Sequence, residues 1–251
     1  MADDEAEQDP GPVDSIRETT GQFRKRLEEL QAVLRDGIGS AVQSSSVYCQ
    51  QFCATLLEFA GGWRIEEEPL PVVQVYIVAL LSYAEAIPFL SLQCENVSLV
   101  VERLSLSFLE LLLSLTVVPD DLWKQVKSSV QLAHNKLQEK GLSQLSLLST
   151  LGQYDGVWTS KVLQGLLLNQ NLQSEQVEEF LVQEGPVLLQ MRVKQLMKEK
   201  QMEKAAFLAK TCSESDLQGK EVFRQMYLVC LCAFSEQDQL MEKVLDWIMI
   251  W

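Results

Sequence analysis

The chain has 251 residues, of which 47% are hydrophobic, so it can bury the core of one large domain or two small ones. Its formal net charge is −14, and five carboxylates lie within residues 1–9. Proteins bind nucleic-acid phosphates through Lys and Arg, so we expect no DNA or RNA binding by this chain itself. The acidic start also lacks the basic and apolar regions of a secretory signal peptide, which predicts an intracellular protein with reduced, buried cysteines.

The first two segments differ sharply in pattern. Residues 1–12 are acidic, end in Pro-Gly-Pro and are predicted to be a disordered tail. Residues 13–36 are predicted to form an amphipathic heptad helix, because apolar residues recur at alternating steps of three and four. This helix either docks on the rest of the chain or pairs with a second copy as a coiled coil; three heptads are marginal alone, which favours docking. Its apolar side chains are possible partner contacts: Ile16, Phe23, Leu27, Leu30 and Leu34.

Residues 41–244 have the pattern of successive α-helices separated by Gly and Pro. Residues 186–209 combine a long helix, a tight connection near Gln201 and an alanine-rich second helix, which is typical of a tetratricopeptide-type (TPR) hairpin. We therefore predict an all-α fold, a TPR-like α-α solenoid of stacked antiparallel helical hairpins, with a compact bundle as the alternative. Helix boundaries are expected at Gly61-Gly62, Pro88, Pro119, Gly141 and Gly185, with Asp120 as an N-cap.

The most apolar stretch, residues 97–118, is long enough to span a bilayer. It carries Glu102, Arg103 and Glu110, and each such charge costs about 2.5–3.5 kcal/mol at the centre of a membrane helix. We therefore expect a buried helix and no membrane contact.

The motifs of common catalytic and metal sites are missing from this sequence. Its one histidine, His134, cannot build a Cys₂His₂ finger and is expected to face solvent or cap a helix. Cys49 and Cys53 lie one helical turn apart, but no third or fourth metal ligand is evident. The prediction is a protein that is not an enzyme and has no catalytic, metal-binding or nucleic-acid-binding residues and no cofactor.

Residues 245–251 form a divergent, strongly apolar C-terminal tail. If it is helical, Trp247 and Trp251 share one face and are further possible partner contacts. Apolar side chains left in water favour association, so self-association is expected.

Several strings, in order over residues 13–244, resemble one family of large zinc finger proteins, that of Rlf and zinc finger protein 292. They are Tyr48 to Cys53, Thr55 to Ala60, Cys94 to Val97, Glu110 to Leu113, Gly156 to Trp158, Glu184 to Pro186, Leu189 to Arg192 and Tyr227 to Cys232. The opening seven residues are similar as well. After Lys243-Val244 the likeness ends, which suggests a truncated isoform, a gene-model artefact or a fragment.

The resemblance implies a long N-terminal TPR-like helical region of a nuclear transcription regulator, whose C-terminal Cys₂His₂ fingers bind DNA. This chain would carry part of the helical region and no finger, so no DNA-binding residue is transferred to it. The expected function is a non-catalytic protein-interaction scaffold in the nucleus, with unidentified protein partners. The alternative is a cytosolic α-solenoid adaptor unrelated to transcription, and an all-α enzyme is a distant third.

Overall fold

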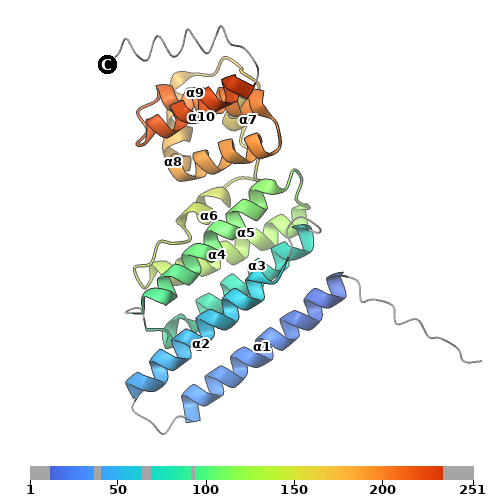
Figure 1. Ribbon diagram of the computed structural model, residues 1–251, viewed down its shortest axis with the longest axis vertical. Helices are drawn as coiled ribbons and strands as arrows, with labels where there is room; N and C mark the ends of the chain where they lie inside the picture. Colours follow the sequence, from blue (N-terminus) through green and yellow to red (C-terminus); the bar gives the residue numbers. More distant parts are fainter. Residues whose placement is uncertain (1–11, 37–40, 64–68, 92–93, 234–251) are drawn as a thin grey trace, which may run out of the picture. The chain divides into compact units, whose positions relative to one another are not determined.

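The computed structural model describes residues 12–36, 41–63, 69–91 and 94–233 (Figure 1). Every regular element in these ranges is helical, which confirms the predicted all-α class. The chain forms two compact units: unit 1 comprises residues 1–111 and 118–149, and unit 2 comprises residues 112–117 and 150–251. The sequence pattern placed no boundary within residues 41–244, so this division is a feature that the structure reveals.

Unit 1 is built around one apolar helix. Its elements are α1 (Pro12–Asp36), α2 (Ala41–Gly61), α3 (Pro69–Ala86), the 3₁₀ helix η1 (Ile87–Phe89), α4 (Glu95–Ser114, in this unit up to Leu111), α5 (Asp120–Gln138) and the start of α6 (Ser146–Leu151). α3 packs against α1, α2 and α5. The Tyr76 ring of α3 stacks on Phe108 of α4 with ring centroids 5.2 Å apart. The Tyr83 hydroxyl donates a hydrogen bond of 2.8 Å to the Val97 carbonyl, which fixes the start of α4.

Among the described residues, the segment Pro69–Phe89 is the one helix that passes a membrane-span test of length and composition, with a mean hydropathy of 1.7. It is not the 97–118 stretch that the sequence singled out. Core helices of folded domains have the same length and composition, and 61% of the most apolar 18-residue stretch of this segment is buried. Its packing on four neighbouring helices is that of a core helix.

Most predicted helix boundaries in unit 1 are confirmed. α2 ends at Gly61, α3 ends at Ala86 just before η1, which contains Pro88, and Gly141 follows α5 with a φ of 74°. The N-cap prediction was wrong: Pro119 is the N-cap, and Asp120 is the first helical residue. Pro119 has φ −56° and ψ 140°, and its carbonyl accepts from the Trp123 amide at 2.8 Å, so the helix begins without a side-chain cap.

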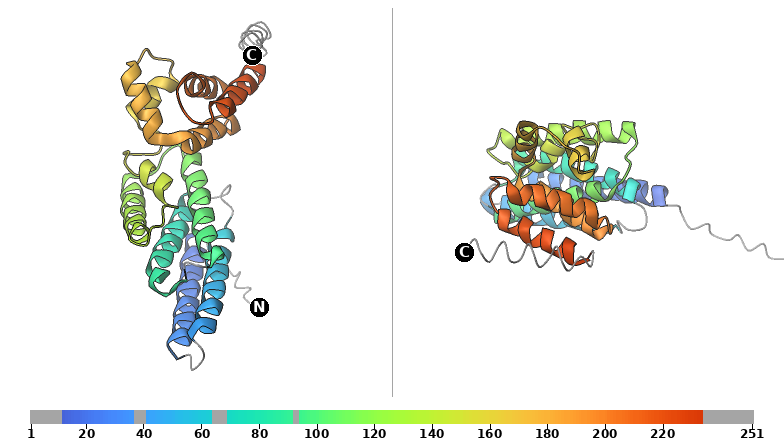
Figure 2. Two further views of the ribbon diagram at one scale, coloured as in Figure 1. Left: turned by 90° about the vertical axis from the view of Figure 1, so that its left-hand side faces the viewer. Right: turned by 90° about the horizontal axis from the view of Figure 1, so that it is seen from above.

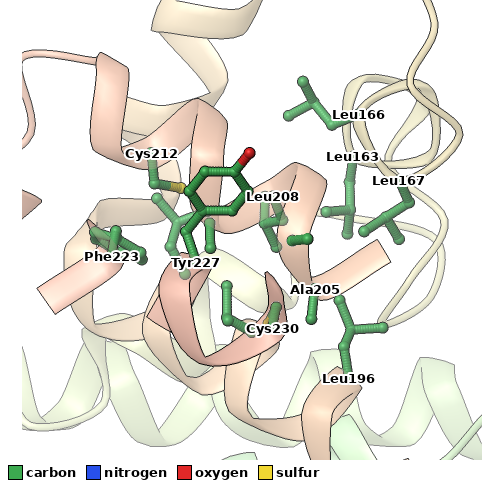
Figure 3. Close-up of a cluster of buried hydrophobic side chains, with 14 of the residues drawn as sticks. Leu163, Leu166, Leu167, Leu196, Ala205, Leu208, Cys212, Phe223, Tyr227 and Cys230 are labelled. Carbon is green, nitrogen blue, oxygen red and sulfur yellow. The ribbon is translucent and has the colours of Figure 1, made fainter. Parts of the chain in front are cut away.

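Unit 2 contains α7 (Lys161–Leu167), α8 (Ser174–Lys198), α9 (Met202–Glu214) and α10 (Lys220–Ala233). α9 packs on α8, α7 and α10, and Figure 2 shows α9 and α10 side by side. In Figure 3 the side chains of α7, α8, α9 and α10 converge on one core, which includes Leu163, Leu196, Leu208 and Tyr227. The predicted small residues of α9, Ala205 and Ala209, are fully buried in it, which allows the neighbouring helices to approach closely.

α8 consists of two helical stretches joined at Gly185, whose φ of 73° and ψ of 163° are not helical. This confirms the predicted stop at Gly185 and restart at Pro186. Glycine reaches a positive φ without steric cost, and proline suits the first turn of the helix that follows.

A buried ion pair spans this kink. Arg192 and Glu184 are both completely shielded from solvent at the side chain, and Arg192 Nε donates to Glu184 Oε2 at 2.6 Å and Nη2 to Oε1 at 3.1 Å. The guanidinium also donates to the Val157 carbonyl at 2.7 Å and lies 5.2 Å from the centroid of the Trp158 ring. The Trp158 indole in turn donates to the Leu113 carbonyl at 3.1 Å. The pair therefore attaches the loop before α7 to both stretches of α8.

The structure corrects two predictions about side-chain exposure. His134 was expected to face solvent or cap a helix, yet it is only 8% exposed. Four residues after Val130 and three before Leu137, it lies on the buried stripe of α5. The cysteines were expected to be buried, but Cys94 is half-buried and Cys232 is exposed; all six are free thiols.

We expect the buried Arg192–Glu184 pair to stabilise unit 2 only as a pair. Glu184→Leu or Arg192→Leu alone should lower the free energy of unfolding by about 3–5 kcal/mol, because each leaves one buried charge without its partner. The double variant should recover much of that loss. Urea unfolding followed by circular dichroism measures all three.

Lys124→Ala serves as the control, because the Lys124–Asp121 pair is 76% and 94% exposed and should contribute no more than about 1 kcal/mol. If the two single variants are as mild as this control, the buried pair does not hold the kink.

His134 should make stability depend on pH. Burial lowers the pKa of His134 below 6.5, so the unfolded chain binds a proton more readily than the folded one. The stability that neutral His134 contributes is fully present above its unfolded-state pKa and is lost as pH falls through its folded-state pKa. His134→Gln should flatten the fall in unfolding free energy that begins just below pH 6.5 in the parent. Parallel curves for parent and variant from pH 7.5 downward would contradict this.

Candidate interaction site

α1 is attached to unit 1 through one side chain above all. Phe23 is 4% exposed, and it is the buried residue among those of α1 whose side chains are described. Its ring stacks on Phe59 of α2 with centroids 4.0 Å apart and planes 6° from parallel. An exposed ion pair of 2.9 Å between Arg26 and Glu58 supports the contact. α1 also contacts α3, so it lies beside both helices, as Figures 1 and 2 show.

Two hollows border α1, one on each side. The α1–α2 pocket has a volume of about 230 Å³, with Phe23 and Phe59 in its wall and the Arg26–Glu58 pair among its lining residues. Because the guanidinium and the carboxylate neutralise each other, this pocket offers no net charge to a partner.

The α1–α3 groove lies on the other side of α1 and has a volume of about 380 Å³. It is lined by Arg24, Leu27, Glu28 and Gln31 of α1, Phe52 of α2, and Val78, Leu81, Ser82 and Glu85 of α3. Leu27, Val78 and Leu81 are half-buried and form apolar walls, and Phe52 is buried. The charged residues Arg24, Glu28 and Glu85 are exposed. An apolar interior with a charged margin is the usual form of a protein-binding groove.

The predicted partner-contact residues of α1 occupy different environments. Leu27 lines the α1–α3 groove, Phe23 lines the α1–α2 pocket, and Ile16 and Leu30 are half-buried. The apolar face of the heptad helix lies toward the protein's own helices, which is the arrangement expected if the helix docks within the chain. The described residues do not include the side chain of Leu34. They also do not include Trp247, Trp251 and the rest of the segment 245–251, for which self-association was predicted, or the predicted acidic tail before Pro12.

Several cysteine and tyrosine side chains among the described residues have raised pKa values, which favour their neutral forms. Burial raises the pKa of Cys53 to about 11, and burial with the nearby charge of Glu184 raises the pKa of Cys212 to about 12. Burial, followed by the charge of Glu184, also raises the pKa of Tyr154. Nucleophilic cysteines need the opposite shift, so these thiols are suited to packing and not to attack on a substrate. Within the described ranges no three His, Cys, Asp or Glu side chains are arranged to hold a metal ion.

The sequence relatives decide the family. Zinc finger protein 292 of Mus musculus is 45% identical over 246 residues, which is 97% of this chain, and that of Homo sapiens is 46% identical over 249 residues. The chain belongs to the zinc finger protein 292 family. Zinc finger protein 654 of Homo sapiens is a more distant relative, 31% identical over 203 residues and 80% of this chain.

The likeness to this family that the sequence strings indicated is thereby confirmed. The chain spans 9% of the length of the zinc finger protein 292 sequences and 18% of zinc finger protein 654. No family model matches the chain, and no solved structure matches it.

We expect Phe23 to be the anchor of α1. Phe23→Ala should release α1 while the other helices of unit 1 stay folded, because truncating a buried phenylalanine costs about 3–5 kcal/mol and α1 has no second buried anchor in its described part. Amide hydrogen exchange should accelerate across α1 and remain slow in α3 and α5.

Val33→Ala on the same helix is the control, because Val33 is 69% exposed. Exchange that accelerates equally throughout unit 1 would show that α1 is an integral part of the core and not a helix attached at one point.

Proposed function

We propose that this chain is a non-catalytic protein-interaction region of a nuclear zinc finger transcription regulator. The observation that carries the proposal is the α1–α3 groove, with its apolar walls and charged margin. The homology of the chain supports the nuclear setting, since the chain belongs to a family of proteins named for zinc fingers. The sequence has one histidine and a net charge of −14, so DNA contact would be made by fingers elsewhere in a longer product.

The proposed region is a set of helical hairpins that stack in the manner of TPR-like repeats. The α8–α9 pair supports this within unit 2: the helices are joined at Gln201, and α9 presents Ala205 and Ala209 to the core. Such helical arrays present grooves between neighbouring helices to protein partners. The proposal assigns the same use to the groove beside α1.

A tethering experiment tests the proposal. The chain is fused to a sequence-specific DNA-binding module, and transcription of a reporter carrying that module's site is measured. We expect a several-fold change in transcription relative to the module alone, because a nuclear interaction region recruits its partners to the promoter. Leu81→Arg should remove the change, since it places a charge in the wall of the α1–α3 groove.

Leu99→Arg on α4 is the matched control, because Leu99 is 52% exposed and outside the groove. Circular dichroism should show that both variants keep the parent helix content. A parent fusion that behaves as the module alone would overturn the proposal.

A further inference from the structure

The α1–α3 groove has a regular geometry that restricts what can occupy it. α1 contributes residues 24, 27, 28 and 31, and α3 contributes residues 78, 81, 82 and 85. Both sets follow the spacing i, i+3, i+4, i+7, which is one face of a helix over two turns. Each wall is therefore about 10 Å long and straight. A segment that lies along such a groove and fills it at regular intervals is itself a helix with apolar side chains at matching steps.

The apolar interior sets the anchors of that helix. Leu27 comes from α1, and Val78 and Leu81 come from α3, so apolar surface borders the groove on both sides. Phe52 of α2 contributes a largely covered ring. A volume of about 380 Å³ is of the size that takes two or three aliphatic side chains together. Leucine-sized residues one turn apart fit this space, whereas an extended peptide would direct alternate side chains away from it.

The margin sets the charge of the partner. Two carboxylates, Glu28 and Glu85, stand on opposite walls, against one guanidinium, Arg24. Glu28 lies one turn beyond Arg24 on α1, and Glu85 lies one turn beyond Leu81 on α3, so each wall of the groove carries one carboxylate. The α1–α2 pocket lacks this property, because Arg26 neutralises Glu58 there. A lysine or arginine beside the apolar anchors would meet an opposite charge on either wall.

We propose that the α1–α3 groove binds a basic amphipathic helix of a partner protein, with leucine-sized anchors against Leu27, Val78 and Leu81 and Lys or Arg beside Glu28 and Glu85. This inference rests on the proposed interaction function and names its partner's chemistry. Apolar contact supplies most of the affinity, and the margin charges supply the preference for a basic over an acidic helix.

Two synthetic helical peptides of about 15 residues test it. They share leucines at i, i+3, i+4 and i+7 and differ only in carrying Lys or Glu at the flanking positions. Binding to the full chain is followed by fluorescence anisotropy at about 0.1 M salt, where charges beyond about 10 Å are screened. The Lys peptide should bind, and the Glu peptide should bind about tenfold more weakly or not at all. Leu81→Arg should abolish binding of the Lys peptide.

Charge reversal separates the groove from the acidity of the whole chain. Glu28→Lys with Glu85→Lys should reverse the preference in favour of the Glu peptide. Glu102→Lys with Glu110→Lys changes the net charge by the same amount on the exposed face of α4 and should leave the preference unchanged. Equal effects of the two reversals would overturn the inference, because the preference would then belong to the overall charge.

The remaining outcomes distinguish the inference from the function on which it rests. If both peptides bind equally and Leu81→Arg abolishes both, the groove is an interaction site and the basic partner is wrong. If no binding depends on Leu81, the groove-based function fails as well. If light scattering shows a dimer that Leu81→Arg dissociates, the groove is filled by a second copy of the chain, which also overturns the inference.

Discussion

Unit 1 depends on the burial of α3, a helix that is apolar on nearly every side. Ten of its 18 residues are buried, and they occupy more than half of the circumference of the helix, so no single neighbour can cover them. α1, α2, α4 and α5 therefore pack around it, and aromatic residues make two of the contacts, Tyr76 on Phe108 and Tyr83 to the Val97 carbonyl. The same demand explains why α3 resembles a membrane span by composition. The position of α1 follows from the same requirement, because α1 covers the part of α2 and α3 that the other helices leave open. This cover is partial, and the α1–α3 groove is the part that remains open.

Unit 2 is constrained in a different way, because its longest helix, α8, is interrupted at Gly185. The positive φ of Gly185 turns the chain between the two stretches of α8, and the Arg192–Glu184 pair bridges them. A buried ion pair is weak evidence of net stability, since desolvation offsets most of the attraction. Its more secure role is geometric: two parallel hydrogen bonds, a third to the Val157 carbonyl and the Trp158 ring allow one arrangement of loop and helix. The charge of Glu184 also contributes to the raised pKa values of Tyr154 and Cys212, which keeps both neutral.

The sequence predicted the features that local pattern controls. Pro88, Gly141 and Gly185 act on their own backbone, so the helix ends were predictable, and the heptad helix of residues 13–36 corresponds to α1 almost residue for residue. Tertiary partners were not predictable. Arg192 is four residues from both Leu188 and Leu196 and so lies on the apolar stripe, a signal of burial, but nothing local shows that Glu184 across a kink neutralises it. His134 carried the same signal on α5. The groove could not be predicted at all, because its walls come from segments about 50 residues apart and only the docking of α1 brings them together.

The heptad pattern of α1 raised a choice between docking within the chain and pairing with a second copy as a coiled coil. Docking of α1 on α2 and α3 still leaves part of its apolar face open to a partner. A helix with one fully buried anchor, Phe23, leaves its other seam residues incompletely covered, and Leu27 is half-buried at the edge of the α1–α3 groove. An isolated helix of this length gains its stability from packing, so α1 must dock before it can form a wall. A partner helix in the groove would bury Leu27 and Leu81 further, adding apolar contact to both α1 and α3. Binding would then stabilise α1 on unit 1, because a ligand that contacts two elements favours the state in which they are held together.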